Sequence, residues 1–344
     1  MTNQRSPLCG VYALCFWFLC GSASASPLDA IIDPINPEIS KWASVFIVKE
    51  QAEAVTFDWE HYKQSQEAVD FWPASTIKLY TVLAGLEYLN ELGMPTDSSL
   101  SFYRQVDDRW RLDTARTMRE MISEVFRRSS NEDYTLLLRF LGIDRMNTQF
   151  LIPQRGFPRS ALMRDYVTYR PIVYENEEPQ KILIMSSSGD RMASVEHTWT
   201  GISYAEKRGA TVLSSTTGNC TSTYELANCV RRLMWHETIP VEERFKLTPE
   251  QIDFVRHGGQ GLVGFENRLA GAYGWEDSGE AVFPKARFYH KAGLISTYSL
   301  DAAYYDDADS GLKFGLAVAA HSGDPTTVKE MAKAICQWIK DKQQ

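Results

Sequence analysis

The sequence has few of the residues from which metal centres and cofactor sites are built. Its six histidines show no metal-ligand spacing, and its six cysteines include no Cys-x-x-Cys pair. A Gly-x-Gly-x-x-Gly match at residues 259–264 follows a helix-like segment rather than a strand, so it does not predict a dinucleotide site. A Gly-x-Ser-x-Gly elbow is absent, which argues against an α/β-hydrolase. We therefore predict no metal and no cofactor.

An apolar run long enough to cross a membrane is also lacking. The run at residues 8–20 is shorter than the about 20 residues that a spanning helix needs. It follows the lone charge Arg5 and precedes a small-residue Ala-Ser-Ala pattern at 23–25. This order predicts a secretory signal peptide over residues 1–25, cleaved near Ala25, with a membrane anchor as the alternative. We expect a secreted or periplasmic protein without a stable membrane anchor after cleavage.

Excess positive charge is missing as well. The net charge is −8, and loss of Arg5 with the signal would leave −9. An acidic protein does not attract nucleic acid through its overall field, so we expect no nucleic-acid partner. We also expect a monomer. After cleavage three cysteines would remain, of which Cys220 and Cys229 could form a disulfide in an oxidising compartment; buried thiols are the alternative.

A serine and a lysine three residues apart lie where a helix should begin. Pro73 suits the first turn, and the apolar run after Lys78 is compatible with a helix. Side chains at i and i+3 share a helix face, so Ser75 and Lys78 would point the same way. A buried lysine has a lowered pKa and can take the proton of a serine nucleophile. Alternatively, Ser75 caps the helix and Lys78 is solvated, and a second Ser-x-x-Lys at 310–313 shows that the motif alone is weak.

Two further short motifs follow. Ser129-Ser130-Asn131 lies between two helix-like runs, and Lys291-Ala292-Gly293 lies at a strand-like segment near the C-terminal end of the fold. Each is weak by itself, because Ser129 could cap a helix and Lys291 could be a surface lysine on a strand. The order and the contexts of the three motifs are more specific than any one of them.

In this order the three motifs resemble those of the serine β-lactamase and penicillin-binding protein superfamily, and most closely those of class A β-lactamases and their relatives. The runs at 136–142 and 221–227 also resemble helices of that family, and the resemblance covers roughly residues 40–344. It implies an α+β, β-lactamase/transpeptidase-like fold, in which an antiparallel sheet flanked by helices adjoins an all-helical lobe. Within one domain at 26–344, the α/β lobe would take in about 40–74 and 283–344, and the helical lobe about 75–282.

Local patterns predict the individual elements. We expect an extended leader at 26–40, strands at 42–48 and 54–57, and helices at 75–92, 114–126 and 133–140. A β-hairpin is expected from 170–174 and 181–185, followed by a loop at 186–190. Helices at about 223–236 and 248–257, strands at 288–290, 299–305 and 313–320, and a helix at 326–340 complete the prediction.

The resemblance implies catalytic roles for four residues. Ser75 would attack a carbonyl and become acylated, and Lys78 would accept its proton or belong to the relay that does. Ser129 would pass a proton to the leaving nitrogen. Lys291 would lend the cleft positive charge, which favours a substrate carboxylate.

It also implies a set of substrate-binding groups. Asn131 would hold Lys78 and the amide side chain of the substrate. The backbone N–H groups of Ser75 and Leu294, beside Gly293, would form the oxyanion hole. Ala292 stands where the family usually has Thr or Ser, so a hydroxyl that normally helps to bind the substrate carboxylate is missing.

A second departure concerns hydrolysis of the acyl group. The Glu-x-x-Leu-Asn segment that supplies the deacylating glutamate of class A β-lactamases is not found, and Glu196-His197 is the pair to inspect instead. Without a carboxylate to activate water, acyl-Ser75 should hydrolyse slowly. We predict an exported serine hydrolase of the class A β-lactamase type that opens β-lactam amides. The alternatives are a D-Ala-D-Ala peptidase or penicillin-binding protein acting on peptidoglycan peptides with slow deacylation, and a non-catalytic binding protein on the same scaffold.

Overall fold

The structure is a computed structural model that describes residues 26–51, 54–211, 218–266, 279 and 281–342. The expected signal peptide at 1–25 lies outside the described residues. No helix within the described ranges is both long enough and apolar enough to cross a membrane.

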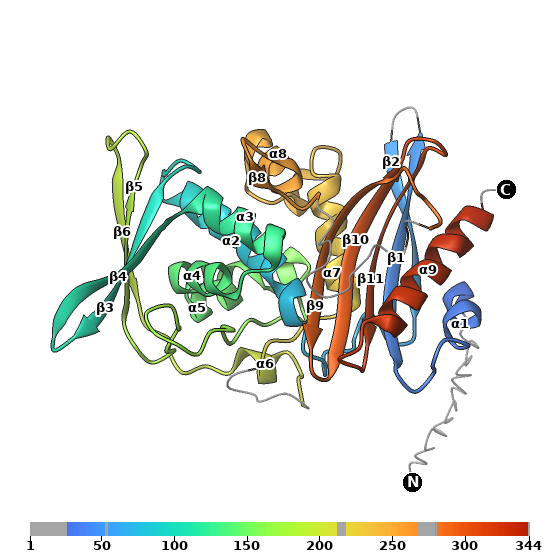
Figure 1. Cartoon of the computed structure of the whole chain (residues 1–344), viewed down its shortest axis with the longest axis horizontal. Coiled ribbons are helices and arrows are strands. Elements are labelled where there is room, and N and C mark those ends of the chain that lie inside the picture. Colours follow the sequence, from blue (N-terminus) through green and yellow to red (C-terminus); the bar gives the residue numbers. More distant parts are fainter. Residues whose placement is uncertain (1–25, 52–53, 212–217, 267–278, 280, 343–344) are drawn as a thin grey trace, which may run out of the picture.

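One antiparallel sheet joins the two ends of the chain. Its strands are β1 (Ser40–Gln51), β2 (Ala54–Tyr62), β9 (Arg287–Ile295), β10 (Tyr298–Asp307) and β11 (Leu312–Ala320), in the order β2-β1-β11-β10-β9. Sequence patterns predicted all five strands, and each is longer than predicted. The order leaves β9, which carries the Lys-Ala-Gly motif, at one edge of the sheet (Figure 1).

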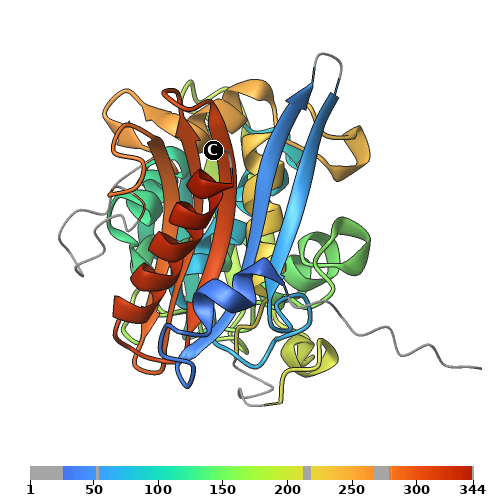
Figure 2. The ribbon, with the colours of Figure 1, turned by 90° about the vertical axis from the view of Figure 1, so that its right-hand side faces the viewer.

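The two faces of this sheet are covered by different helices. In β1, Ala43 and Val45 belong to a buried cluster that includes side chains of α1 (Pro27–Ile32) and α9 (Thr326–Asp341), whereas Phe46 belongs to the core on the other face. This is the alternation that a strand imposes on its side chains. Figure 2 shows α1 and α9 across the outer face. On the inner face α7 (Thr223–Met234) contacts β1, β10 and β11.

The predicted extended leader at 26–40 is wrong, because it contains α1. The hydroxyl of Ser26 accepts a hydrogen bond from the backbone N–H of Leu28, and the Asp29 carboxylate accepts one from the Ser26 N–H. Pro27 occupies the first helical position, where a missing N–H costs nothing. Leu28 and Ile32 are fully buried, so the short helix is held by its contacts with the sheet and α9.

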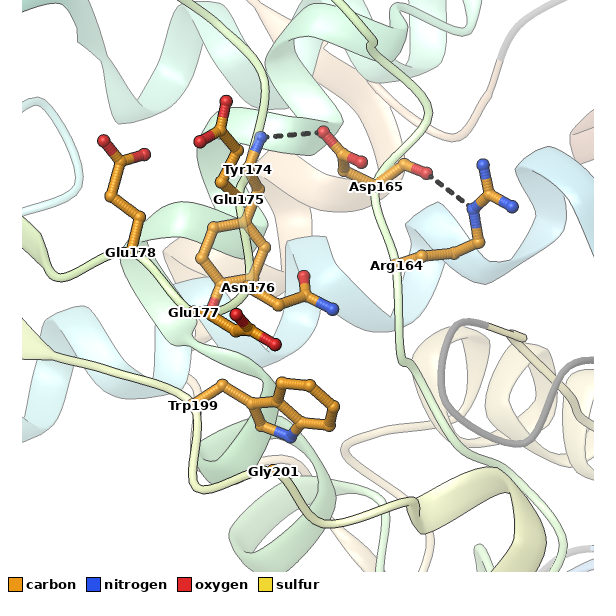
Figure 3. A pocket seen from close by; sticks show the side chains of 9 residues that line it. All are labelled: Arg164, Asp165, Tyr174, Glu175, Asn176, Glu177, Glu178, Trp199 and Gly201. Carbon is orange, nitrogen blue, oxygen red and sulfur yellow. Dashed lines mark hydrogen bonds between the residues drawn. The ribbon is translucent and has the colours of Figure 1, made fainter.

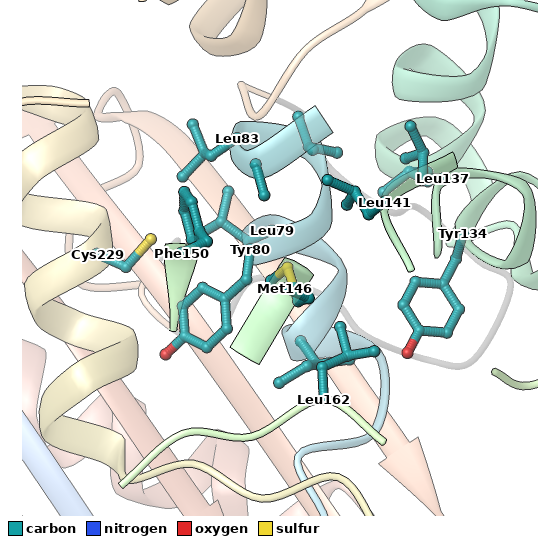
Figure 4. Close-up of a cluster of buried hydrophobic side chains, with 14 of the residues drawn as sticks. Leu79, Tyr80, Leu83, Tyr134, Leu137, Leu141, Met146, Phe150, Leu162 and Cys229 are labelled. Atoms are coloured by element: carbon teal, nitrogen blue, oxygen red, sulfur yellow. The ribbon is translucent and has the colours of Figure 1, made fainter. Parts of the chain in front are cut away.

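The middle of the chain contributes most of the other helices. They are α2 (Lys78–Glu91), α3 (Met118–Arg128), α4 (Asn131–Leu141), α5 (Ile143–Arg145), α6 (Tyr204–Lys207) and α8 (Pro249–His257), with short turns η1 (Ala74–Ile77), η2 (Met146–Phe150), η3 (Pro153–Arg155) and η4 (Val241–Glu243). The predicted helices at 75–92, 133–140, 223–236 and 248–257 are confirmed. Helix α2 runs through the core. Figure 4 shows side chains of α2 (Leu79, Tyr80, Leu83) among Tyr134, Leu137, Leu141, Met146, Phe150, Leu162 and Cys229.

The middle of the chain also carries a four-stranded antiparallel sheet, of which sequence patterns predicted only the strand at 181–185. Its strands are β3 (Ser99–Val106), β4 (Arg109–Thr117), β5 (Gln180–Met185) and β6 (Met192–His197), in the order β4-β3-β5-β6. The strands β7 (Gly258–Gly259) and β8 (Leu262–Val263) form a separate two-stranded sheet. The helix predicted at 114–126 starts only at Met118. Thr117 caps it, because its hydroxyl accepts from the Glu120 N–H while the Glu120 carboxylate accepts from the Thr117 N–H.

Two buried arginines tie this sheet to the segment 157–178. Arg139 of α4 and Arg104 of β3 each donate to the Asp113 carboxylate at 3.0 Å, and both also donate to the carbonyl oxygen of Pro171, at 2.9 and 3.2 Å. Buried charges need such partners. The segment 170–174 is not the predicted strand, and its carbonyl groups at Pro171 and Val173 accept from these arginines instead. The predicted strand at 181–185 is confirmed as β5, which pairs with β6 around the loop at 186–190.

Candidate active site

Ser75 lies on the tight turn η1, directly after a residue with unusual backbone geometry. Ala74 has a φ of 45°, in the left-handed region that non-glycine residues rarely adopt. The Tyr166 hydroxyl donates a hydrogen bond to the Ala74 carbonyl oxygen at 2.8 Å and so holds this conformation. Pro73 is the cap of η1 and Ile77 that of α2. Ser75 therefore does not cap either helix, and that alternative interpretation is wrong.

Lys78 begins α2 and is completely buried, so it is not a solvated lysine. Its Nζ atom lies 2.6 Å from the carbonyl oxygen of Ser129, 2.6 Å from Oδ1 of Asn131 and 3.3 Å from Oγ of Ser129. The first two of these oxygens can only accept hydrogen bonds. A neutral amine has two N–H groups for them and keeps its lone pair for a hydroxyl proton.

Burial and charge both favour the neutral form of Lys78. Burial lowers the pKa of Lys78 well below its ordinary value, and the positive charge of Lys291 lowers it further, against a smaller opposing effect of Asp133. Burial also lowers the pKa of Lys291, to about 7, although Asp301 partly offsets this effect. Burial thus favours the uncharged amine in both lysines, and an uncharged amine is the form that a general base needs.

Ser129 lies between these two amines. Lys291 Nζ donates to its Oγ at 2.8 Å, and that Oγ lies 3.3 Å from Lys78 Nζ. Ser129 closes α3 in a left-handed conformation, with a φ of 55°. The side chain that caps α4 is that of Ser130, whose Oγ accepts from the Asp133 N–H at 3.2 Å. Ser129 thus caps the C-terminus of α3 through its backbone, but its hydroxyl caps neither helix and lies between the two lysines.

The edge strand β9 approaches the Ser75 turn closely. A Cβ atom on Gly293 would lie 2.8 Å from the Pro73 carbonyl oxygen and 3.1 Å from the Ser75 nitrogen, so only glycine permits this approach. Lys291 is completely buried in the same strand, and its Nζ also donates to the Ala292 carbonyl at 2.8 Å. It is not a surface lysine.

Strand geometry also fixes the direction of the Leu294 N–H group. The N–H of His290 donates to the carbonyl of Phe265 at 3.0 Å rather than to β10. N–H groups of alternate residues in a strand point to the same side. The N–H of Leu294 therefore points away from β10, off the sheet edge and toward the cleft, as an oxyanion-hole donor beside Ser75 requires.

A pocket of about 320 Å³ opens over Ser75. Its described lining comprises Trp72, Ala74, Ser75, Ser129, Asn131, Arg164, Tyr166, Ala292, Leu294 and Ile295. The structure thus gathers the three sequence motifs around one space. Among these described residues none is Asp or Glu, and the only charged side chain is that of Arg164.

The loop side of the pocket depends on a residue that sequence analysis missed. Oδ1 of Asn219 accepts from the backbone N–H groups of Met163 and Arg164, at 2.7 and 3.0 Å, and its Nδ2 lies 3.1 Å from the Tyr166 hydroxyl. Asn219, Arg164, Tyr166 and Trp72 carried no sequence signal, because they lie in irregular segments without periodicity or motif. Long-range hydrogen bonds bring Asn219, Arg164 and Tyr166 to the site, whereas Trp72 lies three residues before Ser75.

Aromatic faces flank Lys78 on this side. Its Nζ lies 5.6 Å from the ring centroid of Tyr134 and 5.7 Å from that of Tyr166, and the two ring centroids are 4.9 Å apart. The Trp72 indole N–H donates to the Tyr166 hydroxyl at 3.3 Å. Trp72 and Tyr166 thus line the pocket, and Tyr134 of α4 packs against the Tyr166 ring.

Known structures share this architecture. No protein-family model matches the chain, and no curated protein matches it in sequence. The solved structure of PBP-A matches with a TM-score of 0.52 at 15% identity, over 91% of this chain and 96% of that one. A β-lactamase from Sphaerobacter thermophilus matches with a TM-score of 0.51 at 12% identity, over 92% and 96%. The TLA-1 extended-spectrum β-lactamase matches with a TM-score of 0.53 at 14% identity, over 91% and 98%.

The chain has the fold of the serine β-lactamases and penicillin-binding proteins. The α+β, β-lactamase/transpeptidase-like class predicted from the sequence is therefore correct. The additional β3–β6 sheet shows that the middle of the chain is not purely helical.

Within this β-lactamase-type fold, the pair Glu196-His197 lies outside the pocket. Glu196 on β6 accepts from Lys181 Nζ at 2.5 Å, and His197 Nε2 lies 2.7 Å from the Arg139 carbonyl oxygen. Neither residue is among those that line the Ser75 pocket. The suggestion that this pair activates water is wrong, because its side chains are engaged in the β3–β6 sheet and α4.

Asp165, between the wall residues Arg164 and Tyr166, does not line the Ser75 pocket either. The Asp165 carboxylate accepts from the Tyr174 N–H at 2.9 Å and lines a separate hollow of about 920 Å³, together with Glu175, Glu177 and Glu178. Figure 3 shows this carboxylate on the Tyr174 side of the backbone and the Arg164 guanidinium on the other side. The larger hollow contains none of the motif residues.

The three cysteines that the structure describes do not line the Ser75 pocket. Cys220 and Cys229 are buried thiols, and the Sγ of Cys220 donates to the Arg159 carbonyl at 3.5 Å. This agrees with the buried-thiol alternative rather than with a disulfide. Within the described ranges, no three His, Cys, Asp or Glu side chains are grouped to hold a metal ion.

Proposed function

We propose that the protein is a serine acyl-transfer enzyme that opens β-lactam amides, or D-Ala-D-Ala-type peptides, through an acyl-Ser75 intermediate and releases the acyl group slowly. One observation carries this proposal. The amine of the buried Lys78 is bonded to Ser129 and Asn131, which line the Ser75 pocket, and the described lining of that pocket contains no carboxylate. We expect a penicillin-binding protein rather than a rapid β-lactamase.

In the acylation step, Lys78 acts as the base. The Ser75 oxygen attacks the amide carbonyl while its proton passes to the lone pair of Lys78. The negative charge that develops on the carbonyl oxygen is stabilised by the N–H groups of Ser75 and Leu294. Gly293 supports this role, because it brings β9 within close reach of the Ser75 nitrogen.

Collapse of the intermediate requires a proton on the leaving nitrogen. The Ser129 hydroxyl donates its proton to that nitrogen and recovers one from Lys78, whose Nζ lies 3.3 Å away. The C–N bond breaks, and the acyl group remains on Ser75 as an ester. Lys291, hydrogen-bonded to the same hydroxyl, supplies positive charge that attracts a carboxylate on the leaving-group side.

Deacylation requires a water molecule and a base to activate it. Tyrosine rings flank Lys78 where such a base would act. Burial raises the pKa of Tyr166 to about 12, so its phenol stays protonated and does not take a proton from water. A mutant of PBP-A, a structural neighbour, has been solved as an acyl-enzyme complex with penicillin G, over 91% of this chain at 14% identity. That precedent supports a persistent acyl group here.

We also propose that the protein acts outside the cytoplasm as a monomer. The signal-like segment at residues 1–25 supports export. We expect the protein in the medium or the periplasm. N-terminal sequencing of the exported protein should give a mature N-terminus near residue 26.

The proposal is tested by intact-protein mass after mixing with benzylpenicillin. We expect the wild type to gain the mass of one penicillin and the Ser75→Ala variant to gain none. Peptide mapping should place the adduct on Ser75. Equal labelling of both proteins would contradict the assignment of the nucleophile, and no labelling of the wild type would favour a non-catalytic binding protein.

A further inference from the structure

One charged side chain of the pocket has no role in the chemistry described so far. Arg164 is the only charged residue among the described residues that line the Ser75 pocket. Its Nε donates to the Asp165 carbonyl at 3.3 Å, and its guanidinium carbon lies 4.7 Å from the Trp72 ring centroid. No ion pair joins Arg164 to any carboxylate in the described ranges. Four of its five N–H donors are therefore available.

We infer that Arg164 recognises a carboxylate on the acyl side of the substrate, and that the preferred substrates carry a negative charge on both sides of the scissile amide. This inference rests on the proposed function. It assigns a specificity-determining residue to the loop wall and names the chemical class of acyl donor.

The position of Ser75 between two walls gives the direction of the substrate. On one side the Ser75 turn touches β9 at Gly293, in the strand that carries Lys291; on the other it is bonded to the loop through Tyr166 and the Ala74 carbonyl. A substrate whose carbonyl is bonded to Ser75 extends toward both walls. If its leaving-group carboxylate lies at the Lys291 side, its acyl portion lies at the loop side, where Arg164 is.

Charge and chemistry favour Arg164 as the dominant anion site. An arginine keeps its charge at any working pH and presents donors in a fork that fits a carboxylate. Its stacking on Trp72 holds the guanidinium plane in place without consuming donors. Arg164 also lines the other hollow, but there Asp165, Glu175 and Glu177 would repel an anion, so the anion site lies on the Ser75 side of Arg164.

Two penicillins that differ by one carboxylate provide the test. Carbenicillin is benzylpenicillin with an added carboxylate on the acyl side chain, and the leaving-group side is identical. The quantity measured is the ratio of the second-order acylation rates, carbenicillin over benzylpenicillin, for the wild type, Arg164→Gln and Arg164→Lys. Arg191→Gln, which removes the same charge from an exposed site in the connection between β5 and β6, is the matched control.

We expect the ratio to fall about tenfold in Arg164→Gln, to recover partly in Arg164→Lys and to stay unchanged in Arg191→Gln. An unchanged ratio in Arg164→Gln would overturn the inference. If that variant does not fold, the salt dependence of the two acylation rates of the wild type tests the inference instead. Rising ionic strength should slow carbenicillin more than benzylpenicillin, and an equal effect on both would overturn it.

Failure of the inference is distinguishable from failure of the proposed function. If neither penicillin acylates the wild type, the proposed function is wrong. If both acylate the wild type and the ratio is insensitive to Arg164 and to salt, the proposed function stands and only the role of Arg164 is refuted.

Discussion

The two walls of the Ser75 pocket differ in how far they follow the family pattern. The wall built from α2, the α3–α4 junction and β9 brings Lys78, Ser129 and Lys291 together around one hydrogen-bond network. The loop wall carries Trp72, Arg164 and Tyr166 in place of a carboxylate. The comparison teaches that the groups to which we assign acylation lie within or at the ends of helices and strands, whereas a group for deacylation would have to come from an irregular segment. Such a segment can change while the acylation network persists.

The largest effect should come from removing the base of the first wall. Lys78→Ala takes away the proton acceptor, and general-base contributions are worth about 10²–10⁴-fold. We therefore expect the benzylpenicillin acylation rate to fall by about that factor, measured by stopped-flow competition or mass spectrometry. A rate within threefold of the wild type, in a variant with an unchanged melting temperature, would show that another group takes the Ser75 proton.

The close approach of β9 should give the next largest effect. In Gly293→Ala the new Cβ would lie 2.8 Å from the Pro73 carbonyl oxygen, so the strand and the Ser75 turn must separate. Displacements of the order of 1 Å at a reacting centre cost roughly 10²-fold, and we expect acylation to slow by about that factor. Gly85→Ala is the matched control, because its Cβ would meet Leu137 at an ordinary 3.4 Å. Equal rates for the two variants would contradict a close oxyanion pair.

The lysine pair should shape the pH dependence of acylation. Lys78 must be neutral to act as a base, so the rate should rise with pH through its lowered pKa. Lys291 must be charged to attract the leaving-group carboxylate, so the rate should decline again above its pKa of about 7. Each limb should change the rate by up to about tenfold per pH unit. Lys291→Arg should abolish the declining limb, and a limb that persists in that variant would assign it to another group.

The smallest predicted effect belongs to the loop wall. Tyr166→Phe keeps the ring beside Lys78 but removes the hydroxyl that bonds to the Ala74 carbonyl at 2.8 Å. A hydrogen bond is worth about 1 kcal/mol, so we expect acylation to slow roughly fivefold. Tyr88→Phe, on the far side of α2 against Phe140, should leave the rate unchanged. A loss above a hundredfold in Tyr166→Phe would mean that the hydroxyl takes part in the chemistry.

Regular elements could be predicted from the sequence better than the irregular ones. Short motifs and apolar periodicity located α2, α4 and the five strands of the main sheet, and with them Ser75, Lys78 and Lys291. Two errors could have been avoided, because the capping boxes at Ser26 and Thr117 are visible in the sequence. The predictions of an extended leader and of a helix that starts at residue 114 did not take these capping boxes into account.

The loop wall could not be predicted in the same way. The segment 157–178 is held by Asn219, by the buried Arg104 and Arg139, and by the β3–β6 sheet, all of which are distant in sequence. No periodicity or local motif encodes such contacts. Arg164 and Tyr166 therefore reach the pocket through tertiary structure alone, and only the absence of a Glu-x-x-Leu-Asn segment indicated that this wall would differ.

The central claim is that Ser75 is acylated readily and deacylated slowly. The most direct test is to label the wild type with benzylpenicillin, remove the free drug and follow the intact mass of the protein over time. We predict that the adduct on Ser75 persists far longer than the acylation step takes. Rapid return to the unmodified mass, with steady consumption of added penicillin, would contradict the account and reveal a β-lactamase with a water-activating group that is not a carboxylate of the described pocket lining.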